Sequence, residues 1–347
     1  MEQEEIIRLF CEEKPKNILV KNTSHGDEDY RENWIVEFED HKLVIKLADN
    51  EFTDEDHLNM WEMIVKDYQT HGCYCPNYIK ALDGTFPHVS YDGHDCIVYA
   101  EEYSRYLSAE EYIEKHPETK LVDENGYYTY FRDMVLMDAK VASHYSDYTS
   151  LPSGMCMFEL FVPSDKVDET KNNALKWKAE ADKLPDKFQD QVKRIWNNWL
   201  NARNELEKIY DKLPKSVFQA DNNVSNILVD ENGNLCGVYD FNLGGKDVFI
   251  NLLVRLIPYN GAEDDQVFSE DFYSKSIINA LKIAREVYSF SDLEKKAMPL
   301  LYKCVKPLWW KSSRELEEAN GDEEKIQEFL DFALWEQTRE IGFEKHM

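Results

Sequence analysis

The stretch that most constrains how this chain can fold runs from Gln219 to Asn242. It opens with a polar loop in which Asp221 and Asn226 stand five residues apart, and a short apolar run follows. After the dipeptide Asn232-Gly233, a second apolar run leads to Asp240. Two apolar runs joined by Asn-Gly predict a β-hairpin. The hairpin would bring Asp240 back beside the loop that carries Asp221 and Asn226.

The three side chains on this hairpin all carry oxygen. Carboxylate and amide oxygens, together with phosphate oxygens, are the ligands that Mg²⁺ prefers. An alternative is a surface hairpin rich in turn residues, because Asp and Asn in loops often make only local hydrogen bonds. The spacing of the acid, the amide and the second acid around one hairpin favours a phosphoryl-transfer centre.

The same segment resembles the catalytic loop and metal-binding segment of the aminoglycoside phosphotransferase and choline kinase-like group. The usual form there is His-Gly-Asp, four residues, Asn, and a hairpin that ends in Ile-Asp-Phe or Ile-Asp-Trp. The spacing agrees, but Gln219 and Ala220 stand where the group has His and Gly. The resemblance implies that Asp221 is catalytic and accepts or orients the proton of an acceptor hydroxyl. It also implies that Asn226 and Asp240 hold Mg²⁺ against the phosphates of ATP. A glutamine can form hydrogen bonds in place of the histidine, which mainly supports the backbone.

Length and composition fit a globular protein of two lobes. The chain has 347 residues, which is too long for one small core. No apolar run reaches the ~18 residues of a membrane span, and the acidic amino terminus is unlike a signal peptide. Seven cysteines, an odd number, argue against a disulfide framework. We therefore expect a cytoplasmic protein with no membrane partner.

The formal net charge is −28. A field of this sign repels the phosphates of nucleic acids and attracts cations, including Mg²⁺ and amines. Many proteins are acidic for solubility alone, so the charge does not by itself identify a substrate. It does argue against nucleic acid as a partner.

Residues 33–38 and 42–47 alternate between apolar and polar side chains in a way that predicts two neighbouring strands. Lys46 lies on the second strand, among apolar residues. It could be an edge lysine whose ammonium reaches water. It could also be the lysine that binds the α and β phosphates of ATP.

The next segment predicts a helix from Thr53 to Gly72, with a capping side chain and acids in its first turn. Glu62 lies in the middle of this helix, near its apolar stripe, where an unpaired carboxylate would be costly. Lys46 is sixteen residues earlier, and a strand lysine paired with a helix glutamate is the arrangement of kinase-like lobes. We therefore expect Glu62 to hold Lys46, with Glu55 as the competing choice.

An apolar strand at residues 96–99 leads into Ala100, Glu102 and a polar crossing. This pattern resembles the hinge between the lobes of a kinase, where backbone groups bind adenine. By position in the family, these groups would belong to Ala100 and Glu102.

Together these features predict a bilobal, protein kinase-like α+β fold. Residues 1–102 would form the nucleotide-binding lobe, an antiparallel sheet with one main helix that ends in the hinge. Residues 103–347 would form a mostly helical lobe with the catalytic loop and the acceptor site. In the resemblance, residues 263–347 build that acceptor site, and aromatic residues such as Trp309 and Trp310 beside acids could hold a cationic amine or could equally be helix core.

The expected activity is ATP-dependent transfer of the γ-phosphoryl group to a hydroxyl of a small molecule, such as a cationic amino alcohol or an aminoglycoside. One alternative is a nucleotide-binding pseudokinase with a regulatory function and no turnover. Another is a kinase that acts on proteins, which the short interval between Asp240 and Asp247 disfavours because it leaves no room for an activation segment.

Overall fold

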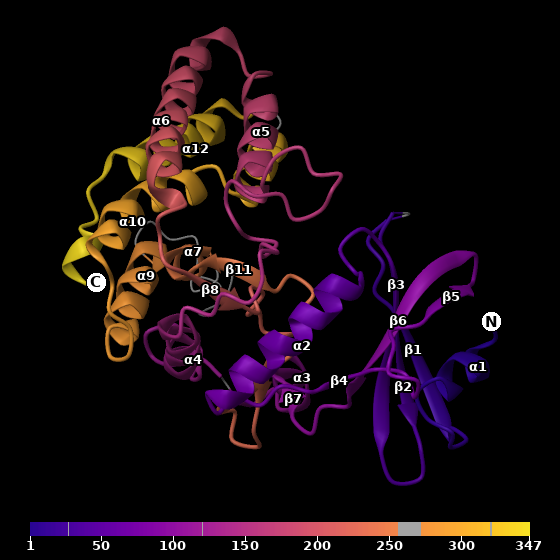
Figure 1. Ribbon diagram of the computed structural model, residues 1–347. Helices are drawn as coiled ribbons and strands as arrows, with labels where there is room; N and C mark the ends of the chain where they lie inside the picture. Colours follow the sequence, from indigo (N-terminus) through magenta and orange to yellow (C-terminus); the bar gives the residue numbers. More distant parts are fainter. Residues whose placement is uncertain (27, 120, 256–271, 320) are drawn as a thin grey trace.

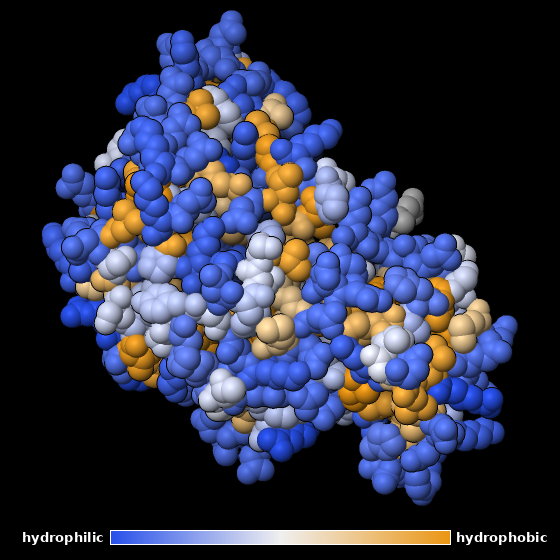
Figure 2. All heavy atoms as spheres, viewed as in Figure 1, coloured by the Kyte–Doolittle hydropathy of each residue, from blue (hydrophilic) through white to orange (hydrophobic). Residues whose placement is uncertain are grey.

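The computed structural model describes residues 1–26, 28–119, 121–255, 272–319 and 321–347. The chain forms an antiparallel sheet near the amino terminus and a mostly helical part beyond it, with one long helix between the two (Figure 1). Hydrophilic residues cover most of the face shown in Figure 2, in keeping with the acidic composition. Among the described residues, no helix is long and apolar enough to cross a membrane. The part of the acceptor region at residues 263–271 lies outside the described residues.

The amino-terminal sheet has six strands in the order β1-β2-β3-β6-β4, and β5 also pairs with β6. All these neighbours are antiparallel. The strand bounds are β1 (Asn17–Asn22), β2 (Tyr30–Glu37), β3 (Lys42–Asp49), β4 (Tyr78–Ile79), β5 (His88–Tyr91) and β6 (His94–Glu102).

The alternation expected in β3 is confirmed, because Leu43, Ile45 and Leu47 are buried in one cluster with residues of the short helix α1 (Gln3–Arg8). β3 lies in the middle of the sheet, between β2 and β6. Lys46, on the opposite face, is only 9% exposed. It is therefore not an edge lysine that reaches bulk water.

The helix α2 (Glu55–Thr70) begins as expected, since the carboxylate of Asp54 accepts a hydrogen bond from the backbone N–H of His57 at 2.8 Å. Its buried face makes two hydrogen bonds to residues beyond β6. The indole N–H of Trp61 donates to the carbonyl of Gly244 at 3.2 Å, and the hydroxyl of Tyr68 donates to Asp138 at 3.1 Å. The helix is thus attached to the carboxy-terminal part of the chain.

Beyond β6 the chain is largely helical, as expected, with short strands that carry the functional loops. The helices are α3 (Ala109–Lys115), α4 (Phe131–Ser143), α5 (Glu169–Ala181), α6 (Asp186–Tyr210), α7 (Phe249–Arg255), α9 (Phe272–Ala284), α10 (Asp292–Val305), α11 (Trp310–Ala319), α12 (Glu323–Thr338) and the 3₁₀ helix η2 (Phe343–Lys345). The aromatic residues at helical spacing in α5 and α6 form a core between these helices, with Trp177 and Trp199 fully buried.

The predicted hairpin is present. Strand β9 (Ile227–Val229) pairs antiparallel with β10 (Leu235–Val238), and β9 also pairs with β7 (Leu107–Ser108). A second pair, β8 (Lys215–Phe218) with β11 (Gly245–Val248), lies on either side of it in sequence. At Gly237 the hairpin meets residue 74 so closely that a Cβ atom would lie 1.7 Å from the carbonyl oxygen of Tyr74. Only glycine fits there, and this contact fixes the hairpin against the segment after α2.

Candidate active site

Gln219 is the first residue after β8 and is fully buried. Its amide nitrogen donates to the carbonyl oxygens of Tyr239, at 3.0 Å, and Asp240, at 2.7 Å. Its amide oxygen accepts a hydrogen bond from the backbone N–H of Asp221 at 2.6 Å. One side chain therefore ties the loop before the hairpin to the chain that leaves it, which is the supporting function expected of a glutamine in place of histidine.

Asp221 is held by two amide side chains of its own loop. The amide nitrogen of Asn226 donates to a carboxylate oxygen of Asp221 at 2.9 Å and to its carbonyl oxygen at 3.0 Å. The amide of Asn223 donates to the other carboxylate oxygen at 2.9 Å. Burial raises the pKa of Asp221, and the nearby charge of Asp240 adds to this shift, although both amides oppose it. The carboxylate thus has a defined direction and increased basicity.

Two residues of the site adopt left-handed backbone conformations that favour glycine. Ala220 has a φ angle of 65° and Asp240 has a φ angle of 59°. Such a conformation costs an L-residue roughly 1–2 kcal/mol. Ala220 is the residue that stands where the resembling group has Gly, and its positive φ angle is one that glycine adopts without strain.

Lys46 contacts two carboxylates, one on the neighbouring strand of its own sheet and one across the cleft at the end of the hairpin. Its ammonium nitrogen is 2.8 Å from Glu101 of β6 and 3.5 Å from Asp240. Burial alone would lower the pKa of Lys46, but the charges of Asp240 and Glu101 raise it well above the ordinary value. The lysine is therefore a buried cation that already lies beside Asp240.

The expected ion pair between Lys46 and Glu62 is wrong. Glu62 pairs instead with Lys66, at 2.5 Å, and with Lys80, at 3.6 Å. The buried face of α2 includes Met60 and Ile64 as well as the apolar positions used for the prediction. Successive residues of a helix are 100° apart, so Met60 and Ile64 shift the centre of the buried face of α2 away from Glu62. Glu62 is then left at the border between the buried and the exposed face.

The hinge prediction also changes. Strand β6 continues to Glu102, and Ala100 lies inside the sheet, paired with Ile45 of β3 and Ile79 of β4. The backbone N–H of Glu102 donates to the carbonyl of Asn77 at 3.0 Å. The added strand β4 thus pairs with β6 at Ala100, where backbone groups were expected to bind adenine, and the crossing between the two parts starts beyond Glu102.

A cavity of about 600 Å³ lies between the sheet and the hairpin. Lys46, Asp221, Asn226 and Asp240 all line it, so these four predicted site residues come together. Glu62, Ala100 and Glu102 are described by the structure and do not line this cavity. The sheet also contributes Arg31 and Tyr99 to its wall, and the loop between β1 and β2 contributes Thr23 and His25.

The donor atoms at this cavity suit a hard cation. Both amide hydrogen bonds of Asn226 to Asp221 use its nitrogen, and its oxygen accepts one long hydrogen bond, from the hydroxyl of Ser225 at 3.3 Å. Asp240 adds a carboxylate with a partly exposed side chain. Two oxygen donors facing a cavity that also holds a buried lysine fit Mg²⁺ with bound phosphates.

A second, smaller cavity of about 250 Å³ adjoins the first at Asp221. Four residues line both cavities: Asp221, Asn223, Met155 and Glu169. The rest of the wall of the smaller cavity combines apolar side chains with polar ones. The apolar side chains are Tyr273, Val305, Leu308, Trp309 and Trp310, and the polar ones are Thr170, Asn173, Asn222 and Arg255. Asp221 therefore lies at the junction of the two cavities.

Sequence reasoning missed a supporting network beneath the loop. Asp138 of α4 is fully buried and accepts hydrogen bonds from Tyr68, at 3.1 Å, and from the amide of Asn222, at 2.7 Å. The hydroxyl of Tyr68 also accepts a hydrogen bond from the backbone N–H of Gln219 at 3.2 Å. Burial raises the pKa of Asp138 to about 7. A lone acid in the apolar stretch of α4 was the available signal.

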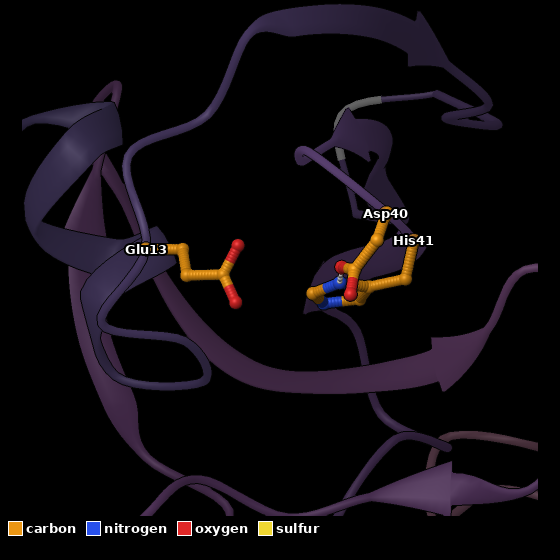
Figure 3. Close-up of side chains that lie close together, drawn as sticks. All are labelled: Glu13, Asp40 and His41. Carbon is orange, nitrogen blue, oxygen red and sulfur yellow. Dashed lines mark hydrogen bonds and ion pairs between the residues drawn. The ribbon is translucent and has the colours of Figure 1, made fainter.

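Another group of acidic and histidine side chains does not line this cavity and lies in the loops before β1 and between β2 and β3. Figure 3 shows Glu13, Asp40 and His41, whose ligand atoms lie within 4.8 Å of one another. All three residues are exposed, and the ring of His41 is already 2.8 Å from the carboxylate of Asp40. We call these residues the edge cluster and assign no ligand to them.

No protein-family model matches the chain, and no curated protein is significantly similar to it in sequence. Solved structures are similar over nearly the whole length. An amicoumacin kinase in complex with AMP-PNP, Ca²⁺ and Ami aligns with a TM-score of 0.56 and 11% identity, covering 97% of this chain and 93% of that one. A microcompartment-associated aminopropanol kinase aligns with a TM-score of 0.55 and 13% identity, covering 96% of this chain and 94% of that one.

A spectinomycin phosphotransferase in complex with ADP and spectinomycin aligns with a TM-score of 0.51 and 11% identity, covering 99% of this chain and 95% of that one. At such low identity these similarities establish the fold alone. The chain has the bilobal, protein kinase-like fold of these small-molecule kinases, the aminoglycoside phosphotransferase and choline kinase-like fold that the resemblance implied.

Proposed function

We propose that this protein is an ATP-dependent kinase that transfers the γ-phosphoryl group to a hydroxyl of a small molecule that also carries an amine. One observation carries the proposal, namely that Asp221 lies where two cavities meet. The larger cavity would hold the nucleotide and the smaller one the acceptor. In this proposal residues 1–102 supply the nucleotide lobe, and residues 103–347 supply the catalytic loop and the acceptor site.

The larger cavity offers groups for a nucleotide triphosphate. Lys46 is a cation beside Asp240 and would neutralise phosphate charge during transfer. Asn226 and Asp240 would hold Mg²⁺, which supplies charge neutralisation for the phosphate oxygens when it is bound. A volume of about 600 Å³ is in the ordinary range of small-molecule sites.

The chemical step assigned to Asp221 is proton acceptance. The hydroxyl oxygen of the acceptor forms a bond to the γ-phosphorus, and the bond from that phosphorus to the oxygen bridging it to the β-phosphorus breaks. The hydroxyl proton passes to the Asp221 carboxylate, and ADP leaves with the bond electrons. The hydrogen bonds from Asn223 and Asn226 hold the carboxylate in one direction for this step.

The smaller cavity favours an acceptor with an amine. Its aromatic side chains Tyr273, Trp309 and Trp310 are of the kind that binds cations, and the Lys306 ammonium already lies 4.4 Å from the ring centroids of Tyr273 and Trp309. Asp221 gives the wall negative charge, whereas the charge of Glu169 is paired with Arg255, which also lines the cavity. A volume of about 250 Å³ suits an amino alcohol or one ring of an aminoglycoside. The names of the similar structures, an aminopropanol kinase and a spectinomycin phosphotransferase among them, support this class of acceptor.

The test is a screen for acceptor-dependent ADP release with Mg·ATP over amino alcohols, aminoglycosides and amine-free sugars. We expect turnover with an amine-containing acceptor, and Asp221→Asn should lower it by about 10²- to 10⁴-fold. Nucleotide affinity, measured by calorimetry, should change little in this variant. The matched control is Glu231→Gln, because Glu231 is an exposed acid in the turn of the same hairpin. It should keep the parent's activity.

The competing hypothesis is a nucleotide-binding pseudokinase without turnover. All the residues for transfer are present, which argues against it. If the parent binds ATP, no acceptor raises ADP release and Asp221→Asn has the same basal rate, the enzyme proposal is overturned in favour of that alternative.

A further inference from the structure

The ion pair of Lys46 with Glu101 joins two neighbouring strands of the sheet. In the antiparallel register of β3 and β6, Lys46 lies opposite Tyr99, and Glu101 is two residues further along the same face of β6. The two charged groups are 2.8 Å apart, and the residues are 9% and 4% exposed. A pair so well shielded from water keeps most of its Coulomb attraction, and losing one partner would leave the other buried and uncompensated.

Asp240 alone is a poor partner for holding Lys46. It is the more distant of the two carboxylates, at 3.5 Å, and its side chain is one-third exposed. In the proposed function Asp240 binds Mg²⁺ and would no longer be free to fix the lysine. Glu101 is 5% exposed in its side chain and does not line the nucleotide cavity, so it stays paired with Lys46 when that cavity is filled.

The helix α2 does not supply this function. Its glutamate, Glu62, pairs with Lys66 and Lys80 outside the nucleotide cavity. The hydrogen bonds of Trp61 and Tyr68 attach the buried face of α2 to the carboxy-terminal part, and they hold the helix in the orientation that pairs Glu62 with Lys66 and Lys80.

We propose that Glu101 is the positioning residue that holds Lys46 toward the phosphates of the nucleotide, as a strand-to-strand pair that replaces the strand-to-helix pair expected from Glu62. This proposal rests on the proposed function, because it takes the 600 Å³ cavity as the nucleotide site. It places the carboxylate partner on the sheet itself, so the orientation of Lys46 would not depend on any movement of α2.

The test is a double-mutant cycle read out by nucleotide affinity, which needs no acceptor. Calorimetry would measure Mg·ATP binding to the parent, Glu101→Gln, Lys46→Met and the double variant. We expect Glu101→Gln to weaken binding by about 10- to 100-fold, the size of loss found for residues that orient metal ligands. Because Glu101 acts through Lys46, the double variant should bind no more than about twofold more weakly than Lys46→Met. If Glu101 affected binding only through the general structure of the sheet, the losses of affinity from Glu101→Gln and Lys46→Met would add in full in the double variant.

Glu62→Gln is the matched comparison and should stay within about twofold of the parent, alone and with Lys46→Met. Glu101→Asp keeps the charge on a shorter side chain and should bind Mg·ATP more tightly than Glu101→Gln but less tightly than the parent. It replaces Glu101→Gln in the cycle if that variant does not fold. Unchanged binding in Glu101→Gln, full additivity with Lys46→Met, or a larger loss in Glu62→Gln would each overturn the proposal.

The outcomes separate this proposal from the proposed function. If the parent binds Mg·ATP and phosphorylates no acceptor, the kinase proposal fails while the binding cycle still decides the function of Glu101. If the parent binds no nucleotide, the assignment of Glu101 is overturned together with the nucleotide site.

Discussion

Two groups of oxygen-rich side chains in this protein look alike in composition and differ in everything around them. The cleft group consists of Asp221, Asn226 and Asp240, and the edge cluster of Glu13, Asp40 and His41. Each set could supply ligands to a cation by residue type alone. The edge cluster is exposed, and its described internal contact joins neighbours in sequence, Asp40 and His41. The cleft group brings together a loop and the end of a hairpin.

The difference lies in what holds the oxygens in place. In the cleft, Gln219 bonds both chain segments, Asn226 bonds Asp221, and Lys46 compensates the charge of Asp240. These contacts exist before any ligand binds, so ordering the group costs little on binding. Exposed charges at the edge are screened by water and salt and keep their side-chain freedom. Preorganised side chains, more than the number of ligand atoms, distinguish a binding site from a chance cluster of polar residues.

The largest effect should come from the same substitution made in each group. We expect Asp240→Asn to lower turnover by more than about 10³-fold, because it removes the charge of the proposed metal ligand and one of the two carboxylate partners of Lys46. Asp40→Asn should leave turnover within about twofold of the parent. The measurement is acceptor-dependent ADP release across a Mg²⁺ titration. Equal losses of turnover in Asp240→Asn and Asp40→Asn would contradict the distinction between the cleft group and the edge cluster.

The second effect concerns Asp138, the buried carboxyl group beneath the cleft, and it is seen in how the free energy of unfolding depends on pH. Asp138 has a pKa raised by burial from 3.8 to about 7. Between these values the unfolded chain loses a proton that the folded protein keeps, so stability falls as pH rises through this window and is constant above it. Asp138→Asn removes this titrating group. The free energy of unfolding of the variant minus that of the parent should therefore rise between pH 4 and pH 7, by on the order of 4 kcal/mol.

Thermal unfolding at several pH values measures this effect, and the edge cluster gives a control of opposite sign. The hydrogen bond from His41 lowers the pKa of Asp40, so its contribution is present at neutral pH and is lost as pH falls. Asp40→Asn should therefore destabilise slightly near neutral pH and have no effect in acid. A flat difference between parent and Asp138→Asn would contradict the assignment.

The third effect concerns Gln219, which joins the two segments of the cleft group. Gln219→Ala leaves two carbonyl oxygens and the N–H of Asp221 without their partner, which should cost about 1–3 kcal/mol of stability. We expect turnover to fall by about 10- to 100-fold as Asp221 loses its fixed direction. Gln219→His, the residue of the resembling group, should recover most of the turnover. Equal rates for the alanine and histidine variants would contradict the supporting function, and ADP release together with thermal unfolding would measure both.

The features that could be predicted from sequence were local ones. The Asn-Gly turn of the hairpin, the cap of α2 at Asp54 and the alternation in β3 each depend on a few neighbouring residues, and all three are confirmed. The hairpin alone brings Asp221, Asn226 and Asp240 together, because its two ends must meet.

The partner of Lys46 could not be predicted, because it depends on contacts between distant segments. Lys46 meets Glu101 only because β6 pairs with β3 in one register, and Glu62 turns away because the packing of α2 centres its buried face elsewhere. The same holds for the hinge, since the two-residue strand β4 that covers Ala100 is too short to leave a sequence pattern.

The smallest effect concerns Ala220, whose backbone has the conformation that its neighbours in the cleft require. Ala220→Gly removes the strain of a positive φ angle but makes the unfolded chain more flexible, so the net gain in stability should be only about 0.5 kcal/mol. The matched control is Ala202→Gly in the interior of α6, where the same change should cost about 1 kcal/mol or more. Thermal unfolding of both variants would show opposite signs. A loss of stability in Ala220→Gly would mean that the positive φ angle at residue 220 carries no strain, and that the backbone of the cleft is not preorganised at a cost.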